Sequence, residues 1–248
     1  MSRRAALQQN RRRTNKPVAG TTWTPASLGS SLVQWIIGDN ATASLASDQS
    51  TGGHDMVEVT GANQPTIVAA SLNGHSVIRF GGGTQHMQSG AWQVGTTAMT
   101  TFMVLRVTSL GTTIAYSKAL NTTDWEWAGQ GSGIIAWDIA GANKALSNAA
   151  VDGGTAHVLI GTYDSTLSPS PTTKMYVDGT LQTTQGTSSA AITNGSDLVG
   201  LGAYVGGTDN SLANMTGDIA EAGACNRALT TGEIAQLQAY LKAKYGTP

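Results

Sequence analysis

Residues 174–184, KMYVDGTLQTT, place an Asp178-Gly179 pair between two runs in which apolar and polar residues alternate. Asp-Gly accepts the two positive φ angles of a type I′ turn. Alternation with a period of two is typical of a strand that buries one face. The stretch therefore predicts a β-hairpin.

Similar runs occur along most of the chain, with turn residues between them. Strands are predicted at residues 32–37, 76–80, 97–108, 114–120, 124–129, 133–140, 157–164, 174–184, 197–206 and 217–225. Residues 46–64 are polar and carry Gly and Asp, which predicts a loop. The 31 glycines are spread along the chain rather than forming a low-complexity block. These features predict an all-β sandwich or barrel.

One helix is predicted, at the C-terminal end in residues 230–246, TTGEIAQLQAYLKAKYG. Thr230 and Glu233 have the spacing of a capping box, and Gly246 is a typical C-terminal stop. The apolar stripe of this helix consists of Ile234, Leu237 and Leu241. Such a stripe favours packing on an edge or end of the sandwich.

The composition limits the class of protein. The single cysteine, Cys225, excludes an intrachain disulfide, and its apolar surroundings predict a buried side chain. No apolar run reaches the ~20 residues of a membrane-spanning helix. The basic N-terminus has no hydrophobic segment after it, so we expect synthesis in the cytoplasm without a signal peptide.

Charge divides the chain into a basic arm, residues 1–20, and one domain, residues 21–248. The arm carries Arg3, Arg4, Arg11, Arg12, Arg13 and Lys16, and its first sixteen residues contain no acid. The rest of the chain has eight Lys and Arg against fifteen Asp and Glu. The arm could bind nucleic acid phosphates, dock on an acidic groove of another protein, or serve only solubility. Without aromatic residues among the arginines, nucleic-acid binding would be non-specific.

Four stretches, taken in order, carry a family resemblance: WTPASLGSSLVQWII (23–37), QPTIVAASLNGHSVIRFGG (64–82), KMYVDG (174–179) and GDIAEAGACNRALTTGEIAQLQAYLKAKYG (217–246). Over residues 22–247 the chain resembles a laminin-G-like branch of the concanavalin A-like lectin/glucanase superfamily. The resemblance implies a two-sheet antiparallel jelly-roll sandwich with one C-terminal helix. The chain departs from the branch at Gly81 and Ile37, where relatives carry Asp.

Members of this branch occur as adhesive modules of bacterial proteins and in structural proteins of tailed phages. The resemblance and the arm together predict a virion structural protein: a capsid decoration, fibre or spike module. The arm would anchor it to capsid or tail proteins, and the outer face would bind host glycans. A trimer is compatible with fibres and spikes. The alternatives are a stand-alone carbohydrate-binding lectin and a self-assembling coat protein whose arm binds the genome.

Residues 124–127, DWEW, are the candidate glycan-binding residues. Asp124 and Glu126 would share one face of a strand, and Trp125 and Trp127 the other. Aromatic faces stack on sugars, and carboxylates accept hydrogen bonds from hydroxyl groups. The structural alternative places both tryptophans in the core and both acids in water. No Glu-x-Asp-x-x-Glu string provides the paired carboxylates of glycoside hydrolysis, so we expect no enzymatic activity.

Metal binding has weaker signals. His54, His75, His86 and His157 are scattered without the spacing of a transition-metal site. Calcium takes lone loop acids, and its candidate ligands are Asp152, Asp164 and Asp209. No other cofactor is predicted.

Asp218 and Glu221 are expected to hydrogen-bond backbone groups near the start of the last strand.

Overall fold

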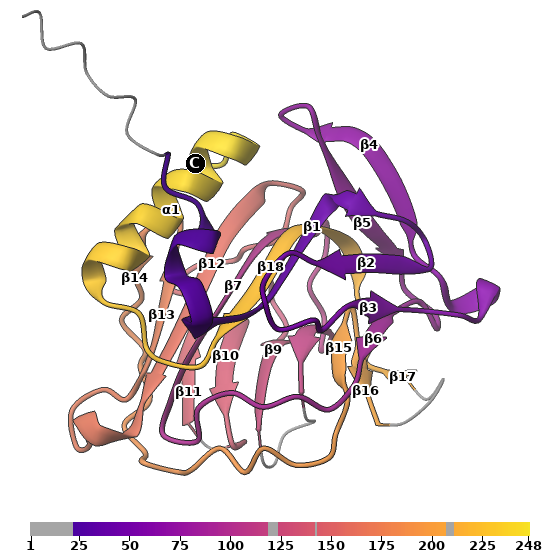
Figure 1. The fold of residues 1–248 in the computed structure, drawn as a ribbon. Helices are drawn as coiled ribbons and strands as arrows, with labels where there is room; N and C mark the ends of the chain where they lie inside the picture. The colour runs from indigo at the N-terminus through magenta and orange to yellow at the C-terminus, as the bar shows by residue number, and fades with distance from the viewer. Residues whose placement is uncertain (1–21, 119–123, 142, 207–210) are drawn as a thin grey trace, which may run out of the picture.

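A computed structural model describes residues 22–118, 124–141, 143–206 and 211–248 (Figure 1). The strands are β1 (Leu32–Ala41), β2 (Leu45–Asp48), β3 (Met56–Val57), β4 (Thr66–Leu72), β5 (His75–Gly81), β6 (Met87–Ser89), β7 (Ala98–Arg106), β8 (Ile114–Ser117), β9 (Trp125–Gly129), β10 (Ile135–Ile139), β11 (Asn143–Leu146), β12 (Ala156–Asp164), β13 (Thr173–Val177), β14 (Thr180–Leu181), β15 (Val199–Leu201), β16 (Tyr204–Val205), β17 (Ser211–Leu212) and β18 (Thr216–Cys225). The helical elements are η1 (Pro25–Ser31), η2 (Gly61–Asn63), η3 (Ser165–Leu167) and α1 (Thr231–Tyr245).

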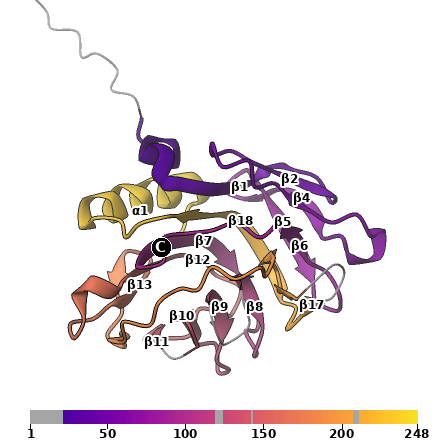
Figure 2. The ribbon, with the colours of Figure 1, turned by 60° about the horizontal axis from the view of Figure 1, so that its bottom comes forward.

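The strands form an antiparallel sandwich of two layers. One layer contains β5, β18, β7, β12 and β13, with α1 lying on its outer face; the other contains β8, β9, β10 and β11 (Figure 2). Hydrogen bonding continues from one layer to the other in the order β8, β15, β6, β3, β2, β1 and β18. The predicted all-β, two-sheet architecture with a C-terminal helix is therefore confirmed.

Two hydrophobic clusters hold the layers together. The larger lies between the layers and includes Phe80, Met103, Trp127 and Trp137. The second lies under α1, where Leu237 and Leu241 of the helix pack with side chains of the sheet such as Phe102, Val158 and Ile160. The first layer is thus buried on both faces where the helix covers it, which explains the long apolar runs in β7 and β12.

The hairpin predicted from Asp178-Gly179 is confirmed. Asp178 has φ 50° and Gly179 has φ 85°, as a type I′ turn requires, and the turn joins β13 to β14. The prediction that residues 46–64 form only a loop is wrong, because this stretch includes most of β2 and all of β3. Ala46 and Met56 pair across these strands and are fully buried. Strands this short carry too few apolar residues for the alternation to be visible.

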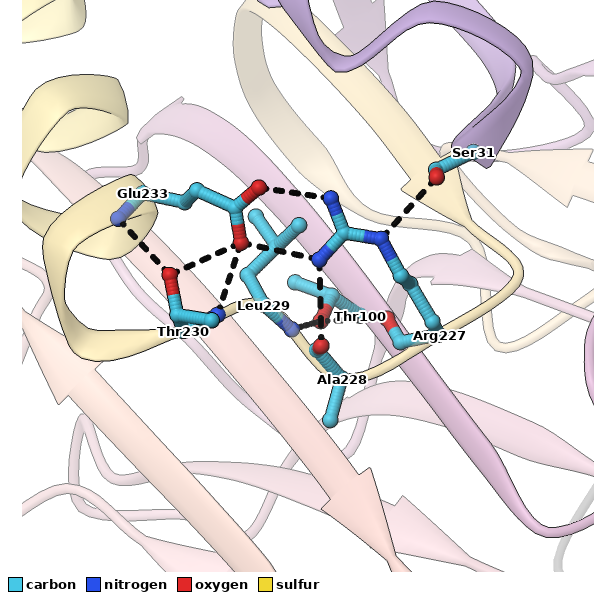
Figure 3. Close-up of polar contacts among 7 residues, drawn as sticks. All are labelled: Ser31, Thr100, Arg227, Ala228, Leu229, Thr230 and Glu233. Atoms are coloured by element: carbon cyan, nitrogen blue, oxygen red, sulfur yellow. Dashed lines mark hydrogen bonds and ion pairs between the residues drawn. The ribbon is translucent and has the colours of Figure 1, made fainter.

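The start of α1 is fixed by the predicted capping box, which is confirmed (Figure 3). The Glu233 carboxylate accepts hydrogen bonds from the Thr230 backbone N–H at 2.9 Å and from both terminal nitrogens of Arg227, at 2.6 and 2.8 Å. Arg227 Nε donates to Ser31 Oγ at 2.9 Å, which ties the helix start to the end of η1. At the other end of α1, Gly246 adopts the expected left-handed conformation.

A buried carboxylate lies under the other end of the helix. Glu221 of β18 is 1 % exposed and accepts hydrogen bonds from Trp35 Nε1 at 2.7 Å, Lys244 Nζ at 2.8 Å and the Tyr245 hydroxyl at 2.8 Å. The expectation that Asp218 and Glu221 bind backbone groups is wrong. The partners of Asp218 are likewise side chains, those of Arg79 and Arg106. An aspartate or glutamate on a buried strand face meets side chains of neighbouring elements, because the strand ladder already uses the backbone groups.

Cys225 is fully buried, as predicted, and burial raises the pKa of its thiol to about 12.

In the part of the chain that the structure describes, no helix has both the length and the apolar character needed to cross a bilayer.

The charge of Glu233 can be tested separately from its capping role by Glu233→Gln, since glutamine also completes a capping box. The hydrogen bond from Arg227 lowers the pKa of Glu233 to about 2, below the unfolded value of ~4.3. The stabilisation from this pair is therefore present at pH 7 and is lost as the pH falls toward the folded pKa. Both side chains are partly exposed, so we expect the variant to be less stable by only about 0.5–1 kcal/mol at pH 7.

Urea denaturation at pH 7 and near pH 2 measures this difference. We expect the difference in the free energy of unfolding to be much smaller near pH 2, where Glu233 is about half protonated, and a difference of the same size at both pH values would contradict the assignment. Arg227→Gln is the companion variant, and its cost should not add to that of Glu233→Gln.

Candidate functional site

Strand β9 carries the DWEW residues. The side chains of Trp125 and Trp127 point into the core between the layers and are 1 % and 0 % exposed. Trp127 Nε1 donates to Thr101 Oγ1 at 2.8 Å, and its ring lies 5.1 Å from that of Trp137. Neither ring therefore offers a face to a sugar, which agrees with the structural alternative for the tryptophans.

Asp124, at the start of β9, is a structural anchor in this conformation. Its carboxylate accepts hydrogen bonds from the backbone N–H groups of Asn194 and Gly195, at 2.7 and 3.0 Å, and from Lys118 Nζ at 3.2 Å. Both ionisable side chains are fully buried. Asp124 thus links residues 194–195 to Lys118 and to the start of β9 and, contrary to the structural alternative, is not in water.

Glu126 points to the outer face of the second layer, where a row of polar side chains crosses four strands. Ser117 and Asp138 are its neighbours in register, and Asp138 in turn faces Lys144, with 2.8 Å between Lys144 Nζ and Asp138 Oδ2. Glu126 itself is 2 % exposed. Both acids of the DWEW stretch are thus almost fully buried.

A cavity of about 220 Å³ opens beside this row. Its polar lining comes from Glu126, Lys144, Gln130 and Thr112. These side chains supply both donors and acceptors, the combination that fits the hydroxyl groups of a sugar. Asp138 is paired with Lys144 and does not line this cavity, so among the described residues Glu126 is the carboxylate in its lining. Within the described residues, Glu126 is therefore the member of the DWEW stretch that lines a cavity.

The calcium candidates have backbone partners. Asp152 Oδ2 accepts from the Leu110 N–H at 3.1 Å, and Asp164 caps η3 by accepting from the Thr166 N–H at 3.0 Å. Asp209 and the arm residues Arg3, Arg4, Arg11, Arg12, Arg13 and Lys16 lie outside the described residues. Among the residues that are described, no three His, Cys, Asp or Glu side chains gather closely enough to hold a metal ion.

One arrangement escaped the sequence predictions. Arg79, Arg106 and Asp218 come together on the outer face of the first layer and line a cavity of about 450 Å³. The three residues lie in β5, β7 and β18, far apart in the sequence, and each appears in an ordinary strand pattern. The sequence signal for this arrangement is an arginine inside a predicted strand, at Arg79 and at Arg106. Such a signal does not show which acidic residue the arginine will pair with.

Comparison with known proteins supports the fold. A family model described as concanavalin A-like lectin/glucanases superfamily matches residues 80–235. No match to a curated protein sequence was found.

Several solved structures have a similar fold. The binding domain of Paraclostridial Mosquitocidal Protein 1 has a TM-score of 0.64 at 13 % identity, with 88 % of this chain and 55 % of that chain covered. A structure of botulinum neurotoxin type C has a TM-score of 0.61 at 13 % identity, with 88 % of this chain and 53 % of that chain covered. Cell entry of that toxin is described as dependent on interaction with two ganglioside molecules. Trypanosoma rangeli sialidase in complex with sialic acid has a TM-score of 0.59 at 11 % identity, covering 86 % and 33 %. The chain spans about half the length of the two toxin chains.

Replacing Trp127 with alanine tests its role as a core residue. Because the indole is fully buried between the layers, we expect Trp127→Ala to lower the free energy of unfolding by about 3–5 kcal/mol. The matched control is Trp23→Ala, which removes a partly buried ring beside Tyr240 and should cost clearly less, about 1–2 kcal/mol. Chemical denaturation followed by far-UV circular dichroism measures both, and equal costs would contradict the core placement.

Proposed function

The chain belongs to the concanavalin A-like lectin/glucanases superfamily, and on this premise we propose that it is a non-enzymatic glycan-binding module that forms part of a virion. Its sugar site would be the cavity beside Glu126, and its basic arm would anchor it to another particle protein.

The polar cavity on the outer face of β9 is the observation that carries the glycan-binding part. At its wall, Glu126 can accept hydrogen bonds, Lys144 can donate them, and Gln130 can do both. Solved neighbours of this fold include a toxin structure described with gangliosides and a sialidase described with sialic acid, which supports a saccharide ligand. A shared fold does not by itself transfer an activity.

The absence of enzymatic activity is proposed from the state of the carboxylates. Hydrolysis of a glycosidic bond needs two carboxyl groups that reach the substrate. Around the β9 cavity, Asp124 is paired with Lys118 and Asp138 with Lys144, both deeply buried. Glu126 is the carboxylate that lines the described cavity, and one carboxylate does not provide the pair that hydrolysis needs.

The virion role is proposed from the charge distribution. A strongly basic arm on an acidic domain is suited to docking in an acidic groove of a capsid or tail protein, where the arm would become ordered on binding. The occurrence of members of the resembled branch in structural proteins of tailed phages points the same way.

Screening the full chain on a glycan array tests the sugar site. We expect specific retention of one or a few glycans, and Glu126→Gln should weaken it at least about tenfold because the acceptor charge is lost. Asp55→Asn makes the same chemical change at an exposed carboxylate outside the cavity and should leave retention unchanged. Retention that Glu126→Gln does not affect would exclude this cavity.

A second experiment tests the arm. Light-scattering mass and the 260/280 nm absorbance ratio are compared for the full chain and a variant with all six arm cations replaced by glutamine. We expect a small, nucleic-acid-free species in both cases. A large particle rich in nucleic acid that collapses in the variant would instead identify a coat protein whose arm binds the genome.

A further inference from the structure

The cavity on the outer face of the first layer contains a row of three charged side chains. In register, Asp218 of β18 lies opposite Arg79 of β5 on one side and Arg106 of β7 on the other. Side chains directly opposite on neighbouring strands stand side by side. The antiparallel pairing of β5, β18 and β7 therefore brings the two guanidinium groups to one carboxylate.

The cavity exists because the residues on the two sides of this charged row differ in size and in how they are covered. Toward the helix, the adjacent residues Val77, Val104 and Ala220 belong to the cluster that α1 covers. Away from the helix, the cavity is lined by small residues, Gly81, Thr108, Thr216 and Gly154. A Cβ at Gly154 would meet no atom within 4 Å, so the space there is open. The cavity thus begins where the helix stops covering the sheet.

The arginines are held in place by the aspartate. Arg79 donates from Nε to Asp218 Oδ1 at 2.7 Å and from Nη2 to Oδ2 at 3.0 Å. Arg106 Nε donates to Oδ2 at 2.9 Å, and Arg106 Nη2 also contacts this oxygen and donates to Ser71 Oγ at 2.7 Å. Burial alone would raise the pKa of Asp218, but the hydrogen bonds from both arginines outweigh it and lower the pKa. The carboxylate is therefore ionised near neutral pH.

The site keeps unused positive charge and donor capacity. Two guanidinium groups share one carboxylate, so one positive charge in the cavity wall is not neutralised. The side chain of Arg79 is 46 % exposed, that of Arg106 is 23 % exposed, and that of Asp218 only 4 %. Within the described part of the chain, Arg79 Nη1 donates no hydrogen bond. A ligand would thus meet guanidinium donors rather than the aspartate.

We propose that this cavity binds the carboxylate of an acidic sugar, a uronic or sialic acid, with Arg79 as the main contact. A carboxylate carries the single negative charge that the wall lacks, and arginine is the side chain that best matches its planar geometry. The Thr108 and Thr216 hydroxyls beside it supply partners for sugar hydroxyls. The volume lies within the usual range of small-ligand sites. This site is on the opposite layer from Glu126 and extends the proposed glycan binding without depending on that cavity.

Ligand-observed NMR titration of the full chain tests the proposal. The probes are glucuronic acid, N-acetylneuraminic acid, glucose and inorganic phosphate, and glucose is the matched analogue of glucuronic acid without the carboxylate. We expect at least one of the two acids to bind at least about tenfold more tightly than glucose, and more tightly than phosphate. Equal binding of glucose and both acids would overturn the proposal, and phosphate binding as tight as that of the acids would reduce the cavity to a general anion site.

Three variants locate the binding. Arg79→Gln removes the exposed guanidinium and should weaken binding of the acid at least about tenfold. Thr108→Glu places a negative charge in the cavity and leaves Arg79, Arg106 and Asp218 in the sequence. It should also weaken binding of the acid at least about tenfold, even if Arg79→Gln proves unstable. Lys242→Gln removes one positive charge from the exposed face of α1 and should change nothing. Unchanged binding in folded Thr108→Glu protein would contradict the site, whereas failure of the Glu126 cavity alone would leave this result unaffected.

Discussion

Glu221 determines how the last strand and the helix of this protein fit together. Its carboxylate is buried in β18, the strand that pairs with β1, β5 and β7, and it accepts hydrogen bonds from β1 through Trp35 and from α1 through Lys244 and Tyr245. The pairing of β18 with β7 shifts register between Ile219 and Glu221, so an irregularity of the strand lies beside this carboxylate. A buried charge that lost these partners would be strongly destabilising, so the helix must lie where it does for the strand to keep its carboxylate. Together with the apolar contacts of Leu237 and Leu241, this contact holds α1 over its part of the outer face.

Local patterns predicted the elements that carry their own signals. The Asp178-Gly179 turn, the Thr230–Glu233 capping box and the apolar runs of β7 and β12 depend on neighbours within a few residues, and all three appear as expected. Strands β2 and β3 were missed because only one residue of each, Ala46 and Met56, is deeply buried. Their strand character comes from pairing with each other and with β1 and β6, which no local pattern encodes.

The sites were harder to predict, for a related reason. Alternation correctly separated the two faces of β9, yet it could not say that the acid-bearing face would also be covered. Asp124 is buried by the 194–195 loop, which is about seventy residues away in the sequence. The row of Arg79, Asp218 and Arg106 is more remote still, because it requires β5 and β7 to lie on either side of β18. A strand order of this kind can come from a family resemblance but not from the periodicity of a single strand.

The two cavities open on the outer faces of opposite layers of the sandwich. A rigid domain of this form cannot bind one flat, sugar-coated surface through both cavities at once, because the cavity that does not face the surface points away from it. If both were occupied, a single chain would instead act as a crosslinker that joins two separate saccharides, and agglutination would need no oligomer. The same geometry leaves one face available for a second partner while the other is engaged, so avidity for a planar surface would have to come from several copies held side by side.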